Sequence, residues 1–159
     1  MDKIIYVGDS SNVINRIIYN HCNGNVESSA FRKTIAELKR FKIVQEKRES
    51  GSIRKRVSPE EEKQISDYIH SGKWRYIICS SYNEAHDFQW FVIERLDPPL
   101  NKNRKPWNKN FAERYEKLFE DLLNSPLYKY DELKEQLRQI NNTGPGVYIF
   151  YHQFLPNEI

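Results

Sequence analysis

Two tyrosines near opposite ends of the chain lie in short segments of similar composition. Tyr6-Val7-Gly8 closes an apolar run that begins at Lys3, and Gly146-Val147-Tyr148 opens another near the C-terminus. A phenol acts as a base only where nearby cations lower its pKa substantially from about 10. Tyrosine is also an ordinary strand residue, so any chemistry depends on the residues that accompany this pair.

Three further side chains complete a set that suits phosphodiester hydrolysis. Arg16 follows Tyr6 by ten residues, whereas Glu94 and Asn101 flank a proline-rich turn. Cleavage needs a deprotonated water, neutralised charge on the phosphoryl group and a protonated leaving oxygen. A guanidinium binds phosphate through two parallel hydrogen bonds, and one carboxylate can hold a divalent cation that acts as a Lewis acid. The alternative is that Arg16 and Glu94 are solvated charges on helices and that the Asn101 amide only hydrogen-bonds the backbone of the turn.

The elements that must position these residues follow from hydrophobic periodicity and caps. The clearest helix start is Ser58-Pro59-Glu60-Glu61, which fits a capping box, whereas the stretch 47–57 contains Ser50-Gly51-Ser52 and is predicted to be a mobile loop. Strands are expected at residues 3–8, 74–79 and 147–152, and helices at about 12–22, 28–41, 58–70, 83–95, 110–124 and 130–141. This order indicates an α+β fold.

Length and composition narrow the class of protein. A chain of 159 residues with 38% apolar residues is long enough to bury one core, so we expect a single domain over residues 1–159. Cys22 and Cys79 fit neither a metal-ligand spacing nor a disulfide framework. The start lacks the pattern of a signal peptide, and no run is long enough for a membrane span. These features predict a soluble, cytoplasmic protein.

The formal net charge of +3 conceals two basic stretches. Residues 47–56 hold five bases and one acid, and residues 102–109 hold four bases and no acid. Concentrated positive charge favours an anionic polymer, because each phosphate contact releases counterions; two solvated basic loops are the alternative. The candidate nucleic-acid contacts are Arg32, Lys47, Arg48, Arg54, Lys55, Arg56, Lys102, Arg104 and Lys105.

Together these motifs resemble the GIY-YIG nucleases, over most of the chain apart from residues 110–141. Gly146-Val147-Tyr148 is similar to the first strand of that family, and Tyr6-Val7-Gly8 is similar to its second. Arg16 stands at the spacing usual in the family, and Glu94 followed by Pro98-Pro99-Leu100-Asn101 is similar to its metal-binding end. Each motif alone is weak, and the specificity lies in their joint occurrence.

The resemblance implies a small three-stranded antiparallel sheet flanked by helices and a role for each matched residue. Tyr148 would activate the water, Tyr6 would hydrogen-bond close by, Arg16 would hold the phosphate and Asn101 would support the site. Glu94 would bind one Mg²⁺ or Mn²⁺. His21 and His152 are secondary candidates. His21 follows Arg16 by five residues rather than four, one position off the expected face of an α-helix, and His152 shares a strand face with Tyr148.

Two features depart from the family pattern. Asp9 follows Tyr6-Val7-Gly8 where many members have a lysine; it would weaken phosphate attraction, or it caps the next helix. The strand order is also reversed along the chain, because the strand that would be central in the sheet comes last. A circular permutation, with residues 110–145 as the return path, explains this order; strand exchange in a homodimer and an accidental C-terminal match are the alternatives.

The sequence therefore favours a divalent-metal-dependent DNA endonuclease that acts on double-stranded DNA. A nucleic-acid-binding module with the same fold and reduced catalysis is the alternative that Asp9 favours. A protein-protein adaptor would lack the steep salt dependence of phosphate contacts.

Overall fold

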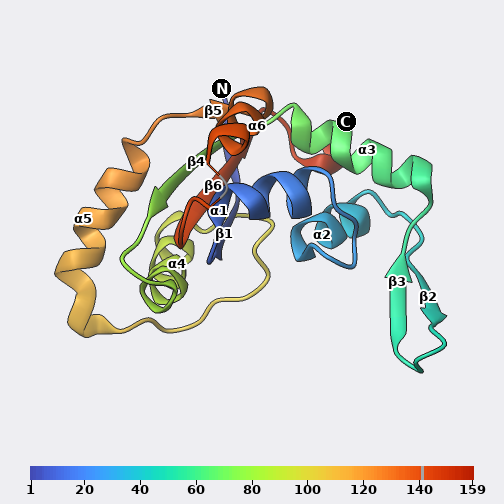
Figure 1. The fold of residues 1–159 in the computed structure, drawn as a ribbon, viewed down its shortest axis with the longest axis horizontal. Helices are drawn as coiled ribbons and strands as arrows, with labels where there is room; N and C mark the ends of the chain where they lie inside the picture. Colours follow the sequence, from blue (N-terminus) through green and yellow to red (C-terminus); the bar gives the residue numbers. More distant parts are fainter. Residues whose placement is uncertain (141) are drawn as a thin grey trace.

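The computed structural model describes residues 1–140 and 142–159, which are built around a four-stranded antiparallel sheet (Figure 1). The strands lie in the order β1 (Lys3–Ser10), β6 (Gly146–His152), β4 (Lys73–Ile78) and β5 (Tyr128–Lys129). The last strand in the chain thus lies between β1 and β4 of its own chain, with Gly8 opposite Tyr148 and Tyr76 opposite Tyr148 on the other side. The expected α+β class is confirmed, and the short β5 adds a fourth strand to the three that were predicted.

Helices cover both faces of the sheet. The helical segments are α1 (Val13–Asn15), η1 (Arg16–Cys22), α2 (Ala30–Leu38), α3 (Pro59–His70), α4 (Tyr82–Leu96), η2 (Lys109–Phe111), α5 (Ala112–Leu123), α6 (Tyr130–Gln139) and η3 (Pro156–Glu158). Ser58 and Glu61 form the predicted capping box of α3, whereas α4 is capped by Ser81 instead of Asn83. The predicted helix end at Asn141 lies outside the described residues.

The alternating residues of β6 divide the core into two clusters. Tyr148 and Phe150 pack among the residues of η1, α2 and α3, whereas Val147 and Ile149 pack against α4 and α5. All seven residues of β6 are buried. This is expected for a central strand whose two faces are both covered by helices.

A β-bulge in β1 alters the direction of one tyrosine. The pairing register of β1 with β6 shifts between Ile4 and Tyr6. Without the shift, Tyr6 would share the face of Ile4, which packs against the α4 cluster. The extra residue instead lets Ile5 and Tyr6 both face the η1 cluster, to which Tyr148 also belongs.

The first helix after β1 changes its hydrogen-bonding pattern at Arg16. Residues Arg16–Cys22 form a π-helix, and its end is marked by an Asn23 N–H that donates to the Ile18 carbonyl, five residues back, at 3.1 Å. Bonds of this type add one residue to a helical turn. The sequence predicted only ordinary helix here.

The stretch 47–57, predicted to be a mobile loop, instead forms the turn and the second strand of a hairpin. β2 (Val44–Lys47) and β3 (Ile53–Arg56) form a two-stranded antiparallel ribbon that projects from the body of the molecule (Figure 1). Gly51, with a φ of 90°, makes the left-handed turn that connects the strands. The Ser-Gly-Ser sequence is therefore a hairpin turn, and the basic residues belong to an ordered ribbon.

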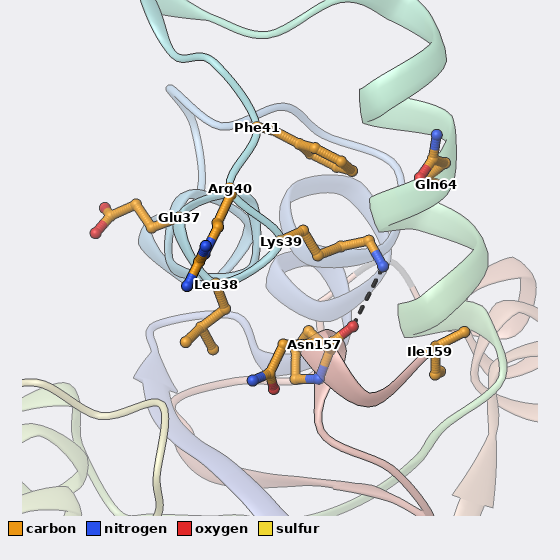
Figure 2. Close-up of a pocket in the computed structure, with 9 residues that line it drawn as sticks. Glu37, Leu38, Lys39, Arg40, Phe41, Gln64, Asn157 and Ile159 are labelled. Carbon is orange, nitrogen blue, oxygen red and sulfur yellow. Dashed lines mark hydrogen bonds between the residues drawn. The ribbon is translucent and has the colours of Figure 1, made fainter.

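The two ends of the described chain lie near each other. This is expected if a circular permutation opened the chain within the hairpin that would otherwise join β6 to β1. Lys3 Nζ and Glu158 Oε1 are 3.3 Å apart. Nearby, η3 packs on the end of α2, where Lys39 Nζ donates to the Pro156 carbonyl at 3.2 Å (Figure 2). The hollow between them, of about 670 Å³, contains none of the predicted site residues. Among the helices in residues 1–140 and 142–159, none combines the length and apolar composition that a membrane crossing requires.

Candidate active site

The site centres on the hydroxyl of Tyr148, which is held in the core by His21. Tyr148 is 1% exposed and His21 is fully buried. Tyr148 Oη lies 2.6 Å from His21 Nε2, and His21 Nδ1 lies 2.7 Å from Ser29 Oγ. When Nδ1 carries the proton and donates to Ser29, Nε2 accepts from Tyr148; the other tautomer reverses both bonds.

The π-helix explains how His21 reaches this position. In an α-helix, a residue five positions after Arg16 would point about 140° away from it. The i→i+5 pattern of Arg16–Cys22 instead brings residues five apart to the same side of the helix. The objection that His21 lies one position off the expected face is therefore wrong, because it assumed α-helical geometry. The spacing of five residues between Arg16 and His21, where an α-helix requires four, was the feature of the sequence that could have indicated the π-helix.

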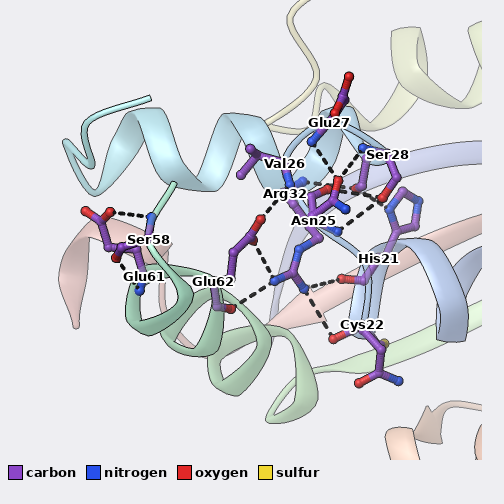
Figure 3. A network of polar contacts seen from close by, with 12 residues as sticks. His21, Cys22, Asn25, Val26, Glu27, Ser28, Arg32, Ser58, Glu61 and Glu62 are labelled. Carbon is purple, nitrogen blue, oxygen red and sulfur yellow. Dashed lines mark hydrogen bonds and ion pairs between the residues drawn. The ribbon is translucent and has the colours of Figure 1, made fainter. Parts of the chain in front are cut away.

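Arg32 holds the end of this π-helix and is not a surface residue (Figure 3). Its side chain is fully buried. Nη1 donates to the carbonyls of His21 and Cys22 at 2.9 and 3.2 Å, and Nη2 donates to Glu62 Oε1 at 2.9 Å. The predicted contact of Arg32 with nucleic acid is wrong, because its charge is satisfied internally by helix-end carbonyls and one carboxylate.

Tyr6 and Gly8 provide the other half of the site. The ring of Tyr6 stacks on Phe31 with centroids 4.4 Å apart and meets His21 edge-on at 5.9 Å. Gly8 lies under the ring of Tyr148, where an added Cβ would stand 2.5 Å from Tyr148 Oη. A glycine is therefore required here by the close approach of Tyr148.

Burial dominates the electrostatics of this group. Desolvation lowers the pKa of His21 well below its usual value, with the charges of Arg16 and Arg32 acting in the same direction. Desolvation also raises the pKa of Tyr148 well above 10; Tyr6 and, more weakly, Asp9 reinforce this increase, whereas Arg16 opposes it. At neutral pH the pair is an uncharged imidazole and an uncharged phenol. Arg16, whose Nη1 donates to the Ser28 carbonyl at 3.0 Å, is the nearby cation.

Asn101 is fastened to the backbone beside Tyr6. Its Oδ1 accepts from the Val7 N–H and its Nδ2 donates to the Val7 carbonyl, both at 2.8 Å. These bonds satisfy part of the outer edge of β1, which has no strand neighbour on that side within the described residues. Asn101 and Tyr6 also line a cleft of about 180 Å³ whose other wall is formed by Gln89, Trp90 and Ile93 of α4.

Glu94 does not line that cleft. It points to a different side of α4 from Gln89, which it follows by five residues, although it follows Trp90, which also lines the cleft, by only four. Its carboxylate accepts from the indole N–H of Trp107, which packs on Phe91 and Tyr115 at the α5 side of the molecule. The structure therefore does not include Glu94 among the residues that line the cleft beside Tyr6. Sequence spacing to Asn101 does not distinguish the faces of α4.

A different carboxylate lies next to the tyrosines. Asp9 Oδ2 is 2.9 Å from His86 Nδ1, and the amide of Gln89 is 3.3 Å from the same nitrogen. Capping of the following helix was one of the two roles predicted for Asp9, but the N-cap residue of α1 is Asn12, and no side chain caps that helix. Within the described part of the chain, no group of three His, Cys, Asp or Glu side chains is arranged to hold a metal ion.

The basic candidates fall into paired and unpaired groups. In the hairpin, Arg48 and Arg54 approach Glu27 at 2.6 and 3.8 Å, and Arg56 pairs with Glu46 at 2.5 Å. Lys47 and Lys55 lie on the opposite face of the ribbon, because side chains alternate along each strand and the two are diagonal neighbours across it.

The second basic stretch begins at one wall of the cleft. Lys102, which lines the cleft, pairs with Glu37 at 2.7 Å, and Arg104 pairs with Asp97 at 2.7 Å. Lys105 lies over the ring of Trp90, with Nζ 5.4 Å from the ring centre. This stretch therefore brings positive charge to the cleft beside Tyr6, although part of it is neutralised locally.

His152 has a structural setting. Its Nδ1 accepts from the Phe154 N–H at 2.9 Å, so Nε2 is the nitrogen that donates to Ser71 Oγ, at 2.8 Å. The ring stacks on Tyr68 at 4.2 Å. His152 follows Tyr148 by four residues along an extended strand, about 13 Å, so sharing a face does not bring the two together.

Fold and site define an α+β domain in which two neighbouring strands present tyrosines to a helix that carries arginine and histidine. A family model described as the GIY-YIG catalytic domain matches residues 1–120, and the chain belongs to that family. Membership implies nuclease activity and a nucleic-acid substrate. Neither the curated proteins nor the solved structures gave a match. The family match ends before β6, so it does not test the permuted order.

Proposed function

We propose that this protein is a divalent-metal-dependent endonuclease that hydrolyses phosphodiester bonds in double-stranded DNA. The observation that carries the proposal is the buried contact of 2.6 Å between Tyr148 Oη and His21 Nε2, beside the guanidinium of Arg16. A core packed only for stability does not require a hydroxyl and an imidazole joined in this way, since apolar groups of similar shape would serve.

Each residue has a task in this proposal. Tyr148 takes a proton from the attacking water while its own proton moves to Nε2 of the neutral His21, so no free tyrosinate forms. Ser29 Oγ accepts a hydrogen bond from the Nδ1–H of His21, which keeps the proton on Nδ1 and leaves Nε2 free to accept a proton from Tyr148. Arg16 binds the phosphate and stabilises the charge that develops on it. A bound divalent cation would supply further charge neutralisation.

We further propose that the strand order reflects a circular permutation within one domain. The support is topological: β6 pairs with β1 and β4 of the same chain, and Lys3 and Glu158 lie 3.3 Å apart. The hairpin of a conventional order would join β6 to β1, which are antiparallel neighbours here. Strand exchange between two copies is the competing explanation.

A DNA-binding module with reduced catalysis is the second candidate. The observations that favour it are the enclosure of Tyr148, the raised pKa of its phenol and the position of Glu94 outside the cleft. Both candidates use the basic hairpin and cleft rim for phosphate contacts, so both predict affinity that falls steeply with salt.

Cleavage of supercoiled plasmid in Mg²⁺ or Mn²⁺ separates the two candidates. Nicking by the wild type that is lost in Tyr148→Phe and in Arg16→Ala supports the endonuclease. Equal nicking by Tyr148→Phe would contradict the role of Tyr148. Salt-sensitive DNA binding with no cleavage in either metal would support the binding module instead.

A further inference from the structure

We propose that Asp9, His86 and Gln89 form the divalent-cation site of this protein. The three side chains come from the end of β1 and from one side of α4. Asp9 Oδ2 and the Gln89 amide both approach a single atom, His86 Nδ1, at 2.9 and 3.3 Å. Since the family uses a metal ion, the inference rests on the proposed function and concerns where that ion binds.

The separations fit a common coordination sphere. With ligands about 2.1 Å from an octahedral ion, neighbouring ligand atoms stand about 3.0 Å apart. Asp9 Oδ2 and His86 Nδ1, at 2.9 Å, have this separation already. The nitrogen and oxygen of the Gln89 amide have the same shape, and a half-turn of the amide presents Oε1 instead of Nε2. Carboxylate, imidazole and amide oxygen would then face one point.

Exposure also suits a cation that must reach a substrate. The side chain of Asp9 is 14% exposed and that of His86 is 52% exposed. The charged ligand is therefore shielded from water, which strengthens its attraction for a cation, while the outer side remains open to water and phosphate. Gln89 also lines the cleft that contains Tyr6 and Asn101, so the ion would lie at the end of that cleft.

Asp9 acts electrostatically on both tyrosines. Its negative charge raises the pKa of Tyr6 and of Tyr148, whereas Arg16 lowers both. A cation held by Asp9 would cancel the unfavourable contribution and add to that of Arg16. Asp9 stands where many family members have a lysine, so a cation bound to Asp9 would restore positive charge at that position.

The ligand set predicts the choice of metal. Mg²⁺ prefers oxygen ligands alone, whereas an imidazole nitrogen favours transition metals. A site of two oxygens and one nitrogen should therefore bind Mn²⁺ more tightly than Mg²⁺, and Co²⁺ more tightly than Mn²⁺.

The test is Mn²⁺ binding to the full chain, measured from the loss of the free Mn²⁺ signal in electron paramagnetic resonance. We expect one ion per chain in the wild type and affinity about tenfold weaker or more in Asp9→Asn and His86→Ala. Gln89→Glu should bind more tightly, because it adds a charged ligand. Glu94→Gln, which removes a carboxylate charge as Asp9→Asn does but from α4, the helix that carries His86 and Gln89, should leave the affinity within about twofold.

Circular dichroism and thermal melting verify that Asp9→Asn and Gln89→Glu remain folded. Gln89→Glu is informative because tighter Mn²⁺ binding, unlike a loss of binding, does not result from misfolding. Binding lost in Glu94→Gln and retained in Asp9→Asn would overturn the site. No Mn²⁺ binding by the wild type would overturn it too, even if plasmid cleavage were observed and the endonuclease upheld. Binding as expected without cleavage would keep the site and shift the function to the binding module.

Discussion

The hydroxyl of Tyr148 and the imidazole of His21 are 2.6 Å apart although 127 residues separate them in the chain. The contact depends on two local irregularities. The π-helix turns His21 inward, and the bulge in β1 places Tyr6 beside the pair. Such irregularities cost stability and recur where side-chain direction has a function.

Removal of the Tyr148 hydroxyl should affect catalysis far more than stability. Tyr148→Phe keeps the ring, but it leaves His21 Nε2 without its partner, which costs about 1 kcal/mol. Nicking of plasmid should fall by about 10² to 10⁴-fold. The matched control is Tyr76→Phe on the neighbouring strand, whose hydroxyl donates to Gln136 at 3.0 Å. A similar loss of nicking in both variants would contradict a specific role for Tyr148.

Deletion of Tyr19 should be tolerated. Tyr19 is 60% exposed and lies within the π-helix, so its removal allows α-helical bonds and leaves Arg16 and His21 four residues apart on one face. We expect native circular dichroism and nicking within about tenfold of wild type. Deletion of Thr34 from the α-helix α2 is the control, because it rotates the following residues by about 100°. If both deletions unfold the chain, the idea that the π-helix accommodates one extra residue is contradicted.

Arg32 should be among the most important residues for stability. Arg32→Met removes a buried charge that bonds to two helix-end carbonyls, and it leaves the Glu62 carboxylate with the Val26 N–H but without its cationic partner. We expect a loss of about 3–5 kcal/mol in the free energy of unfolding in urea. The control Arg54→Met removes an exposed arginine 3.8 Å from Glu27 and should cost at most about 1 kcal/mol. Equal effects would refute the internal role of Arg32.

His21 should make the fold sensitive to mild acid. Its pKa in the folded chain is lowered well below 6.5 by burial, so below about pH 6.5 the unfolded chain binds the additional proton. The free energy of unfolding should therefore decrease as the pH falls through this value, by up to about 1.4 kcal/mol per pH unit. His21→Gln should flatten the profile between pH 6.5 and 5. His152, whose pKa is lowered as well, is present in both proteins and cancels in the comparison.

The sequence predicted the regular elements better than the site. Periodicity and caps located the strands and most helices, and the two tyrosine motifs located β1 and β6. The hairpin was missed because Ser50-Gly51-Ser52 also fits a flexible loop, and β2 lies on a ribbon with little apolar alternation.

The site was only partly predictable for reasons of geometry. No propensity distinguishes a π-helix from an α-helix, so His21 was placed on the wrong face. Spacing alone assigned Glu94 to the site, although Gln89 and His86 occupy the side of α4 that faces β1. Arg32 looked like a surface base because its buried partners, two carbonyls and Glu62, are contributed by other elements.

The position of β6 in the sheet has a consequence for synthesis. Translation proceeds from the N-terminus, so β1 and β4 leave the ribosome before the strand that lies between them. Until Gly146–His152 emerges, these two strands have no partner on the facing edges, and the hydroxyl of Tyr148 does not yet exist. A growing chain therefore lacks the tyrosine–histidine pair on which the proposed mechanism depends and has two open strand edges, which we expect to favour aggregation until β6 is made.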